Sequence, residues 1–232
     1  MIGTSDRMVE TLARLNHYVD EHRSRLKGDI TPPLTVAINR QAGSRGAEIA
    51  RLAGARLGWP VYDHELLERI AAEKGLHARL VEQLDERRLT WLQSLVVAYS
   101  RDGGREGAYL QALLELFGSL SEIGHCIIVG RGAAHVLPPE TTLRVRITAD
   151  RAARVEHVQK SQGMPHADAE RWVNSTDHER QRFVRYYFRA DVHDAMLYDL
   201  ILRSDRLGGE ETAALIAHTA QTVDARMRLS AG

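Results

Sequence analysis

Short apolar runs alternate with amphipathic segments along most of this chain. Apolar residues recur at helical spacing between the runs, as at Ile49, Leu52, Ala53 and Leu57. The runs themselves are short and rich in β-branched residues, which is typical of buried strands. They lie at residues 34–39, 59–63, 126–130, 143–148 and 198–203. Strands that alternate with helices predict an α/β fold, a three-layer, doubly wound, parallel five-stranded sheet.

A further amphipathic segment precedes the first strand. Met8, Leu12, Leu15 and Val19 share one face of a helix expected over residues 5–27, which the glycine and the proline pair that follow would end. We therefore expect residues 1–30 to form an extra N-terminal helix before a domain over residues 31–232. The apolar face would pack on the core or on a second copy of the chain, so a homodimer is one of the alternatives.

Charged residues or glycines follow all five predicted strands. In open α/β sheets, ligands bind outside the carboxyl ends of the strands. Five such ends together indicate a site for an anionic ligand. The residues concerned are Arg40, Asp63, Gly130, Arg131, Asp150, Arg151, Arg203 and Asp205.

The turn after the first strand has the character of an anion-binding loop. Gly43 and Gly46 permit unusual backbone angles and close approach of a ligand, and the N-terminus of the next helix presents free N–H groups. The loop lacks the G-x-x-x-x-G-K-[ST] pattern, because Gly46 stands where the lysine would be. An ordinary strand-to-helix turn that needs glycines fits the same residues.

The amino-acid composition argues against several classes of protein. The chain has 232 residues, with 31 basic and 31 acidic side chains, so it lacks the basic excess typical of nucleic-acid binders. Only Lys27, Lys74 and Lys160 are lysines, which leaves arginine as the main source of positive charge. Cys126 is the single cysteine and excludes an internal disulfide. No run approaches the roughly 18 apolar residues of a membrane span, so we expect a cytoplasmic protein with no membrane partner.

Several segments, in order, resemble the cytidylate kinase-like family. The stretch from Asn39 to Ala50 is similar to the family's SRQ-x-GSGG-x-EIA, and residues 59–67 to its P-x-YD-x-EL. Residues 126–133 resemble VIVGRCA, and Asp177 begins a DKER-like block. The resemblance implies a P-loop NTPase fold of the nucleotide kinase type. It also implies a helical insert that binds a nucleoside monophosphate at about 64–123 and a lid at about 150–190.

The resemblance implies a nucleotide kinase-like phosphotransferase that moves phosphate from ATP, with Mg²⁺, to a nucleoside monophosphate such as CMP. Phosphoryl transfer depends on positioning and charge neutralisation, so arginines are suitable catalytic groups. The implied catalytic and acceptor residues are Arg180, Arg131, Asp63 and Arg154, with Arg180 as the transition-state arginine. The implied donor-nucleotide residues are Arg40, Gln41, Gly43, Ser44, Arg45, Gly46 and Arg151. No metal-ligating cluster is expected.

Two departures from the family pattern keep other functions open. Arg45 replaces the middle glycine of the loop, and Gly132 stands where an acidic residue follows Gly-Arg in true cytidylate kinases. The alternatives are a nucleotide-sensing module that has lost catalysis and a kinase for another small acceptor. Single residues also have structural alternatives: Ser44 as a turn serine, Asp63 as a helix cap, and the lid arginines as a solvated face.

Overall fold

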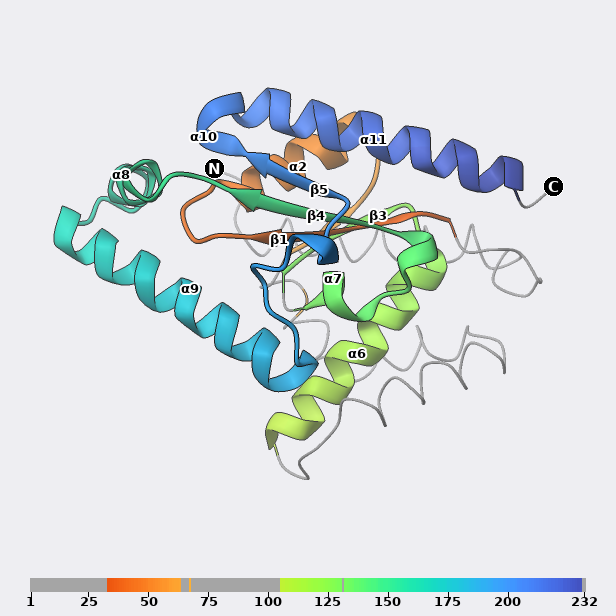
Figure 1. Cartoon of the computed structure of the whole chain (residues 1–232), viewed down its shortest axis with the longest axis horizontal. Coiled ribbons are helices and arrows are strands. Elements are labelled where there is room, and N and C mark those ends of the chain that lie inside the picture. Colours follow the sequence, from red (N-terminus) through yellow and green to blue (C-terminus); the bar gives the residue numbers. More distant parts are fainter. Residues whose placement is uncertain (1–32, 64–66, 68–104, 131, 231–232) are drawn as a thin grey trace, which may run out of the picture.

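The computed structural model describes residues 33–63, 67, 105–130 and 132–230, and within them a five-stranded parallel sheet (Figure 1). The strand order is β2-β3-β1-β4-β5, so β1 is central. All pairings are parallel, as the sequence predicts. The strands are β1 (Thr35–Arg40), β2 (Val61–Tyr62), β3 (Cys126–Val129), β4 (Thr142–Thr148) and β5 (Leu200–Arg203).

The apolar runs form strands because both faces of the sheet centre are covered. Alternate residues of β1 enter different cores: Val36 and Ile38 join one cluster, and Ala37 joins the other. The first cluster lies under α2 and α11, and the second under α6 and α7. A strand buried on both sides needs apolar residues at successive positions, which is the pattern seen.

Helices fill the outer layers and one end of the sheet. The α8–α9 pair packs together beyond the carboxyl ends of the strands, at the left of Figure 1. The α-helices are α2 (Gly46–Leu57), α6 (Arg105–Ile123), α7 (Ala133–Val136), α8 (Arg151–Gln162), α9 (His166–Phe188), α10 (Ser204–Leu207) and α11 (Gly209–Ser230). Two 3₁₀ turns, η2 (Pro139–Thr141) and η3 (Ala195–Leu197), precede β4 and β5.

The helix boundaries follow local signals in the sequence. Gly58 ends α2 with a left-handed backbone (φ 70°), and the Asp150 carboxylate caps α8 by accepting a hydrogen bond from the Ala152 N–H at 2.9 Å. Helix α6 begins at Arg105, directly after two glycines of the sequence. The four-residue helices α7 and α10 are too short to leave a periodic pattern.

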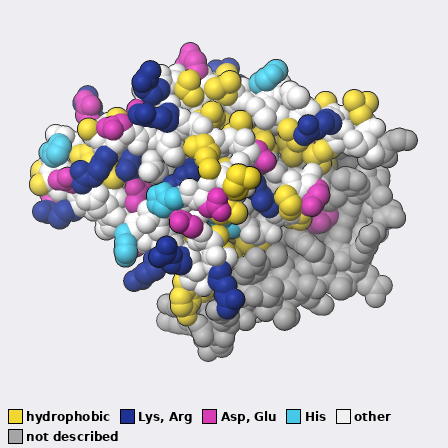
Figure 2. Space-filling model, viewed as in Figure 1, with side chains coloured by type: hydrophobic (Ala, Val, Ile, Leu, Met, Phe, Trp, Pro, Cys, Tyr) yellow, Lys and Arg dark blue, Asp and Glu magenta, His cyan; other side chains and the backbone are white. Residues whose placement is uncertain are grey.

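The N-terminal extension (residues 1–30) and most of the expected insert (64–123) lie outside the described residues. None of the helices in the described residues has both the length and the apolar character to cross a membrane. On the face drawn in Figure 2, the basic side chains of the described part lie beside acidic ones instead of gathering in one patch. This distribution agrees with the zero formal net charge.

Candidate phosphate-binding site

The turn between β1 and α2 is an open bend with two left-handed residues. Gly43 has φ 76° and Arg45 has φ 60°. The Ser44 backbone N–H and its side-chain hydroxyl both donate to the Gln41 carbonyl, at 3.3 and 2.8 Å. Left-handed backbone is unusual for a residue other than glycine. This explains why the related family has glycine where this chain has Arg45.

Most backbone N–H groups of this bend have no acceptor in the part of the chain that the structure describes. The Gln41 N–H donates to the Ile147 carbonyl, and the first amide of the following helix to find an acceptor is that of Ile49, bonded to the Arg45 carbonyl. Five amides between these points have no partner among the described residues, and a helix N-terminus adds its positive dipole. These five amides belong to Gly43, Arg45, Gly46, Ala47 and Glu48. Such a row of N–H groups binds phosphate oxygens.

Two glycines hold the Arg40 side chain beside this row. A Cβ atom on Gly46 would clash with the Cβ and Cγ of Arg40, and one on Gly130 would clash with its guanidinium. The side chain therefore runs from the end of β1 past the start of α2 to the end of β3. The Arg180 Nη1 donates to the Arg40 carbonyl at 3.3 Å, which brings a second guanidinium to the same edge of the sheet.

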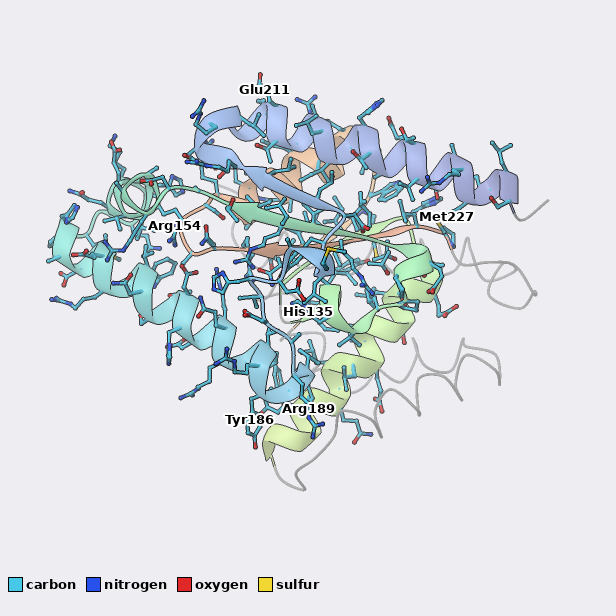
Figure 3. All side chains as sticks on the ribbon, in the orientation of Figure 1. His135, Arg154, Tyr186, Arg189, Glu211 and Met227 are labelled. Atoms are coloured by element: carbon cyan, nitrogen blue, oxygen red, sulfur yellow. The ribbon has the colours of Figure 1, made fainter. Side chains whose placement is uncertain are left out.

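A buried ion pair attaches the bend to the α8–α9 helices. The Arg154 Nη1 lies 2.6 Å from the Asp177 Oδ2, and the two side chains are only 8% and 18% exposed. Together they bind both backbone groups of one residue: Arg154 donates to the Ala42 carbonyl at 3.0 Å, and Asp177 accepts from the Ala42 N–H at 2.7 Å. Gly43 packs against the Arg154 backbone, where a Cβ would lie 2.5 Å from the carbonyl oxygen. We call Arg154 and Asp177 the loop bracket; Figure 3 labels Arg154.

Other predicted phosphate ligands bond the protein itself. The Gln41 side-chain oxygen accepts from the Ala149 N–H at 3.1 Å, and Arg151 donates to Glu170 at 2.7 Å across the α8–α9 pair. Arg45 pairs with Glu48 at 2.6 Å, and this hydrogen bond raises the pKa of Arg45 and lowers that of Glu48. The roles expected for these side chains toward a nucleotide stay predictions.

The two acceptor-side candidates follow β2 and β3. The carboxylate of Asp63 is 38% exposed and lies 3.8 Å from the Arg51 guanidinium. Its backbone carbonyl accepts the Leu67 N–H at 2.9 Å. Arg131 lies outside the described residues, although its neighbours Gly130 and Gly132 are described.

A cavity of about 340 Å³ adjoins the bend, and Gly43 and Arg45 are among its lining residues. Its lining joins the loop to α8 and to the segment after β5, and includes Gly43, Arg45, Lys160, Ser204 and Asp205. The Ser204 hydroxyl donates to the Ser44 carbonyl at 2.8 Å. Ser204 and Asp177 were not among the site residues that the sequence predicted. Ser204 follows the fifth strand, and Asp177 begins the DKER-like block.

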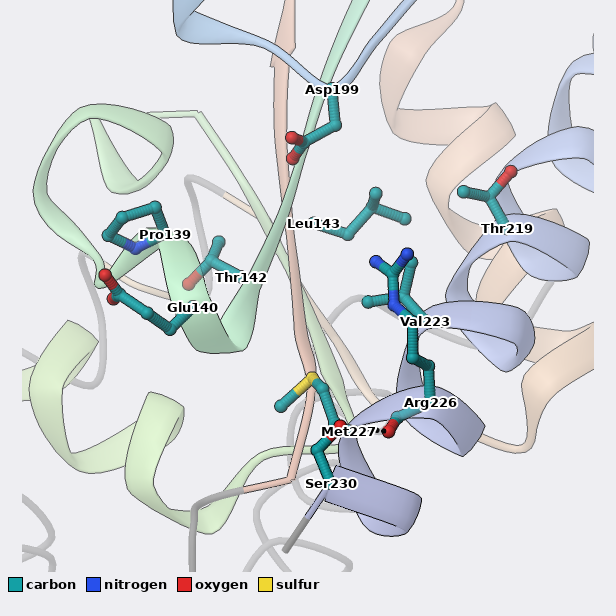
Figure 4. A pocket seen from close by; sticks show the side chains of 10 residues that line it. All are labelled: Pro139, Glu140, Thr142, Leu143, Asp199, Thr219, Val223, Arg226, Met227 and Ser230. Carbon is teal, nitrogen blue, oxygen red and sulfur yellow. Dashed lines mark hydrogen bonds between the residues drawn. The ribbon is translucent and has the colours of Figure 1, made fainter.

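A second cavity, of about 500 Å³, lies at the opposite, amino edge of the sheet (Figure 4). It is lined by the starts of β4 and β5 and by the last turns of α11, with Asp199 and Arg226 among its residues. It is therefore separate from the bend. The described residues contain no group of three or more His, Cys, Asp or Glu side chains that could hold a metal ion.

The strand order and the glycine bend after the central strand define a P-loop fold of the nucleotide kinase type. The chain belongs to the cytidylate kinase-like family, whose profile matches residues 35–206. It is 25% identical over 175 residues to a cytidylate kinase of Methanothrix thermoacetophila, a match that covers 75% of this chain and 90% of the relative. An uncharacterized protein from Eubacterium ventriosum has a similar fold, with a TM-score of 0.67 and 18% identity over 82% of this chain and 99% of its own.

Proposed function

We propose that this protein transfers a phosphoryl group from ATP to a nucleoside monophosphate such as CMP. The observation that carries the proposal is the row of five unpaired amides in the bend, with the Arg40 and Arg180 guanidiniums beside it. Backbone amides and guanidiniums aimed at phosphate oxygens are the groups that phosphoryl transfer requires. Membership of the cytidylate kinase-like family supports the reaction class.

The five amides of this row would hold the donor phosphates, and Arg40 would supply the charge that a loop lysine gives in other kinases. Guanidinium is suited to this role because it binds phosphate oxygens through two parallel N–H groups. Mg²⁺, bound with the triphosphate, would neutralise the remaining charge. The adjoining cavity of about 340 Å³ would receive the rest of the donor nucleotide.

Arg180 and Arg131 would contact the transferring and acceptor phosphates, and Asp63 would face the acceptor. Arg180 suits this position because α9 brings it to the carbonyl of Arg40, at the edge of the bend. Arg154 acts differently in this proposal: its Nε and Nη1 both donate to protein acceptors, so it positions the loop.

The test is turnover with a panel of nucleoside monophosphates, ATP and Mg²⁺, in wild type and in Arg180→Ala. We expect a diphosphate product from CMP, and a fall in kcat of about 100-fold or more in Arg180→Ala, the size typical of a lost transition-state donor. Arg171→Ala, an exposed arginine on the same helix, is the control and should keep wild-type turnover. Binding of ATP without any diphosphate product would favour the nucleotide-sensing alternative. A product only with other acceptors would favour a different kinase.

A further inference from the structure

A basic cluster, with Arg146 and Tyr198 buried and Arg144 and His135 half-buried, lies on the face of the sheet that α6 and α7 cover. It consists of Arg144 and Arg146 on β4, His135 on α7 and Tyr198 just before β5. The two arginines alternate with apolar residues that enter the α2–α11 core, so both project from the same face. Arg146 is only 6% exposed, and Figure 3 places His135 beneath the sheet beside α7.

Among the described residues, the guanidiniums of this cluster donate to neutral acceptors. The Arg146 Nη1 donates to the Asn39 Oδ1 and to the Tyr198 hydroxyl, both at 3.3 Å, and its guanidinium carbon lies 5.5 Å from the Tyr198 ring centroid. The Arg144 Nη2 donates to the Leu137 carbonyl at 2.9 Å, whereas its Nε is buried and unpaired. No carboxylate among the described residues pairs with the guanidinium of Arg144 or Arg146.

His135 adds unused hydrogen-bonding capacity. Both of its ring nitrogens are buried and have no partner among the described residues. Burial, together with the positive charges of Arg144 and Arg146, lowers the pKa of His135 to about 4. At neutral pH the ring is therefore uncharged and offers one N–H donor and one acceptor nitrogen.

Buried charges in native proteins are paired with an opposite charge or fully hydrogen-bonded, because an uncompensated buried charge is strongly unfavourable. The Asp199 Oδ2 accepts a hydrogen bond from the Arg144 backbone N–H at 2.7 Å. The carboxylates that affect the pKa of Tyr198 are those of Asp191 and Asp194. Both lie on the surface and accept backbone N–H groups, of His193 at 3.0 Å and Met196 at 2.9 Å. The cluster therefore holds two guanidiniums that form no ion pair with a carboxylate of the described residues.

We propose that this basic cluster binds an oxyanion, a phosphate or carboxylate group, between Arg144, Arg146 and the His135 ring. The cluster lies close to the bend, because Arg146 is in register with Asn39, the residue before Arg40. An anion bound there is either part of the acceptor substrate or a free anion bound beside that substrate. The first alternative rests on the proposed function.

The test uses inorganic phosphate as the probe, titrated calorimetrically into protein whose bend is filled with a non-hydrolysable ATP analogue. Wild type should bind phosphate, and Arg146→Met should bind it at least about tenfold more weakly, the effect of one lost charge-assisted hydrogen bond. Arg226→Met, the same change at an exposed arginine of α11, should bind as wild type does. NMR signals of the His135 ring should shift with phosphate in wild type and not in Arg146→Met.

A second signature separates a ligand-binding arginine from a structural one. Without phosphate, Arg146→Met should melt about 2–4 °C above wild type, because a buried charge without a partner is replaced by an apolar side chain of similar size. A lower melting temperature, or unchanged His135 signals in wild type at saturating phosphate, would overturn the proposal. The His135 signals decide the matter even where Arg146→Met does not fold.

Competition identifies the source of the anion. Displacement of phosphate by CMP, with a raised acceptor KM and an unchanged ATP KM in Arg146→Met, would assign the cluster to the acceptor. Simultaneous binding of CMP and phosphate would assign it to a separate anion. The phosphate titration measures binding and needs no turnover. A protein without kinase activity can therefore still confirm or refute the anion site, so the two proposals are tested separately.

Discussion

Removal of the Asp177 carboxylate tests whether the loop bracket holds the phosphate-binding bend to the α8–α9 pair. Asp177→Ala leaves Arg154 buried without the carboxylate that lies 2.6 Å from it. The free energy of unfolding should fall by about 3 kcal/mol, a value at the low end for buried pairs because Asp177 is 18% exposed. The substitution also leaves the Ala42 N–H without its acceptor, which costs about 1 kcal/mol more. The sum of about 4 kcal/mol predicts a fall in Tm of roughly 10 °C for a chain of this size.

Thermal and urea unfolding at pH 7 measure this effect, and the same helix provides a matched control. Glu170→Ala removes the carboxylate that pairs with the exposed Arg151, so it should cost less than about 1 kcal/mol. The double variant Arg154→Met/Asp177→Leu should recover much of the loss, because both charges leave together. Equal small effects of Asp177→Ala and Glu170→Ala, or additive effects in the double-mutant cycle, would refute the reasoning.

Three shorter predictions concern other residues. Gly130→Ala places a Cβ against the Arg40 guanidinium, so ATP affinity should fall about tenfold, the value of one charged hydrogen bond. Gly58→Ala is the control, because Gly58 also has a left-handed backbone but open space around it. Equal ATP affinities of the two variants would contradict the prediction. Burial raises the pKa of Asp224, but hydrogen bonds and nearby positive charges outweigh burial and leave it below its usual value. The stability that Asp224 contributes is therefore present above about pH 3.9, its unfolded value, and is lost as pH falls through the lower folded value. Asp224→Asn should flatten the acid limb of unfolding free energy against pH, and parallel curves would contradict this. Burial raises the pKa of the Cys126 thiol to about 12, so alkylation at pH 8 should require unfolding, as labelling across a urea series would show.

The sequence predicted features that depend on neighbouring residues, and missed those that join distant ones. The strand positions are local features and are confirmed, and the glycine that ends α2 and the aspartate that caps α8 are likewise signals of the immediate sequence. The loop bracket joins Ala42 to a carboxylate 135 positions away, which no periodicity records. Arg146 stands in an alternating strand, a pattern typical of a solvent-facing side, yet the structure buries it.

The conformation of Arg40 explains why the bend has a glycine at position 46, where other kinases of this fold have a lysine. A side chain at position 46 would begin with a Cβ that clashes with the Arg40 Cβ and Cγ, so a lysine there and this Arg40 conformation exclude each other. Arg45, the other candidate for the missing charge, is 40% exposed, pairs with Glu48 and lies near Gly209 on the cavity side. Gly46 thus makes room for an arginine that approaches the bend from β1. A single substitution of Gly46 by lysine would displace Arg40, and would exchange one positive charge at the bend for another without adding to the total there.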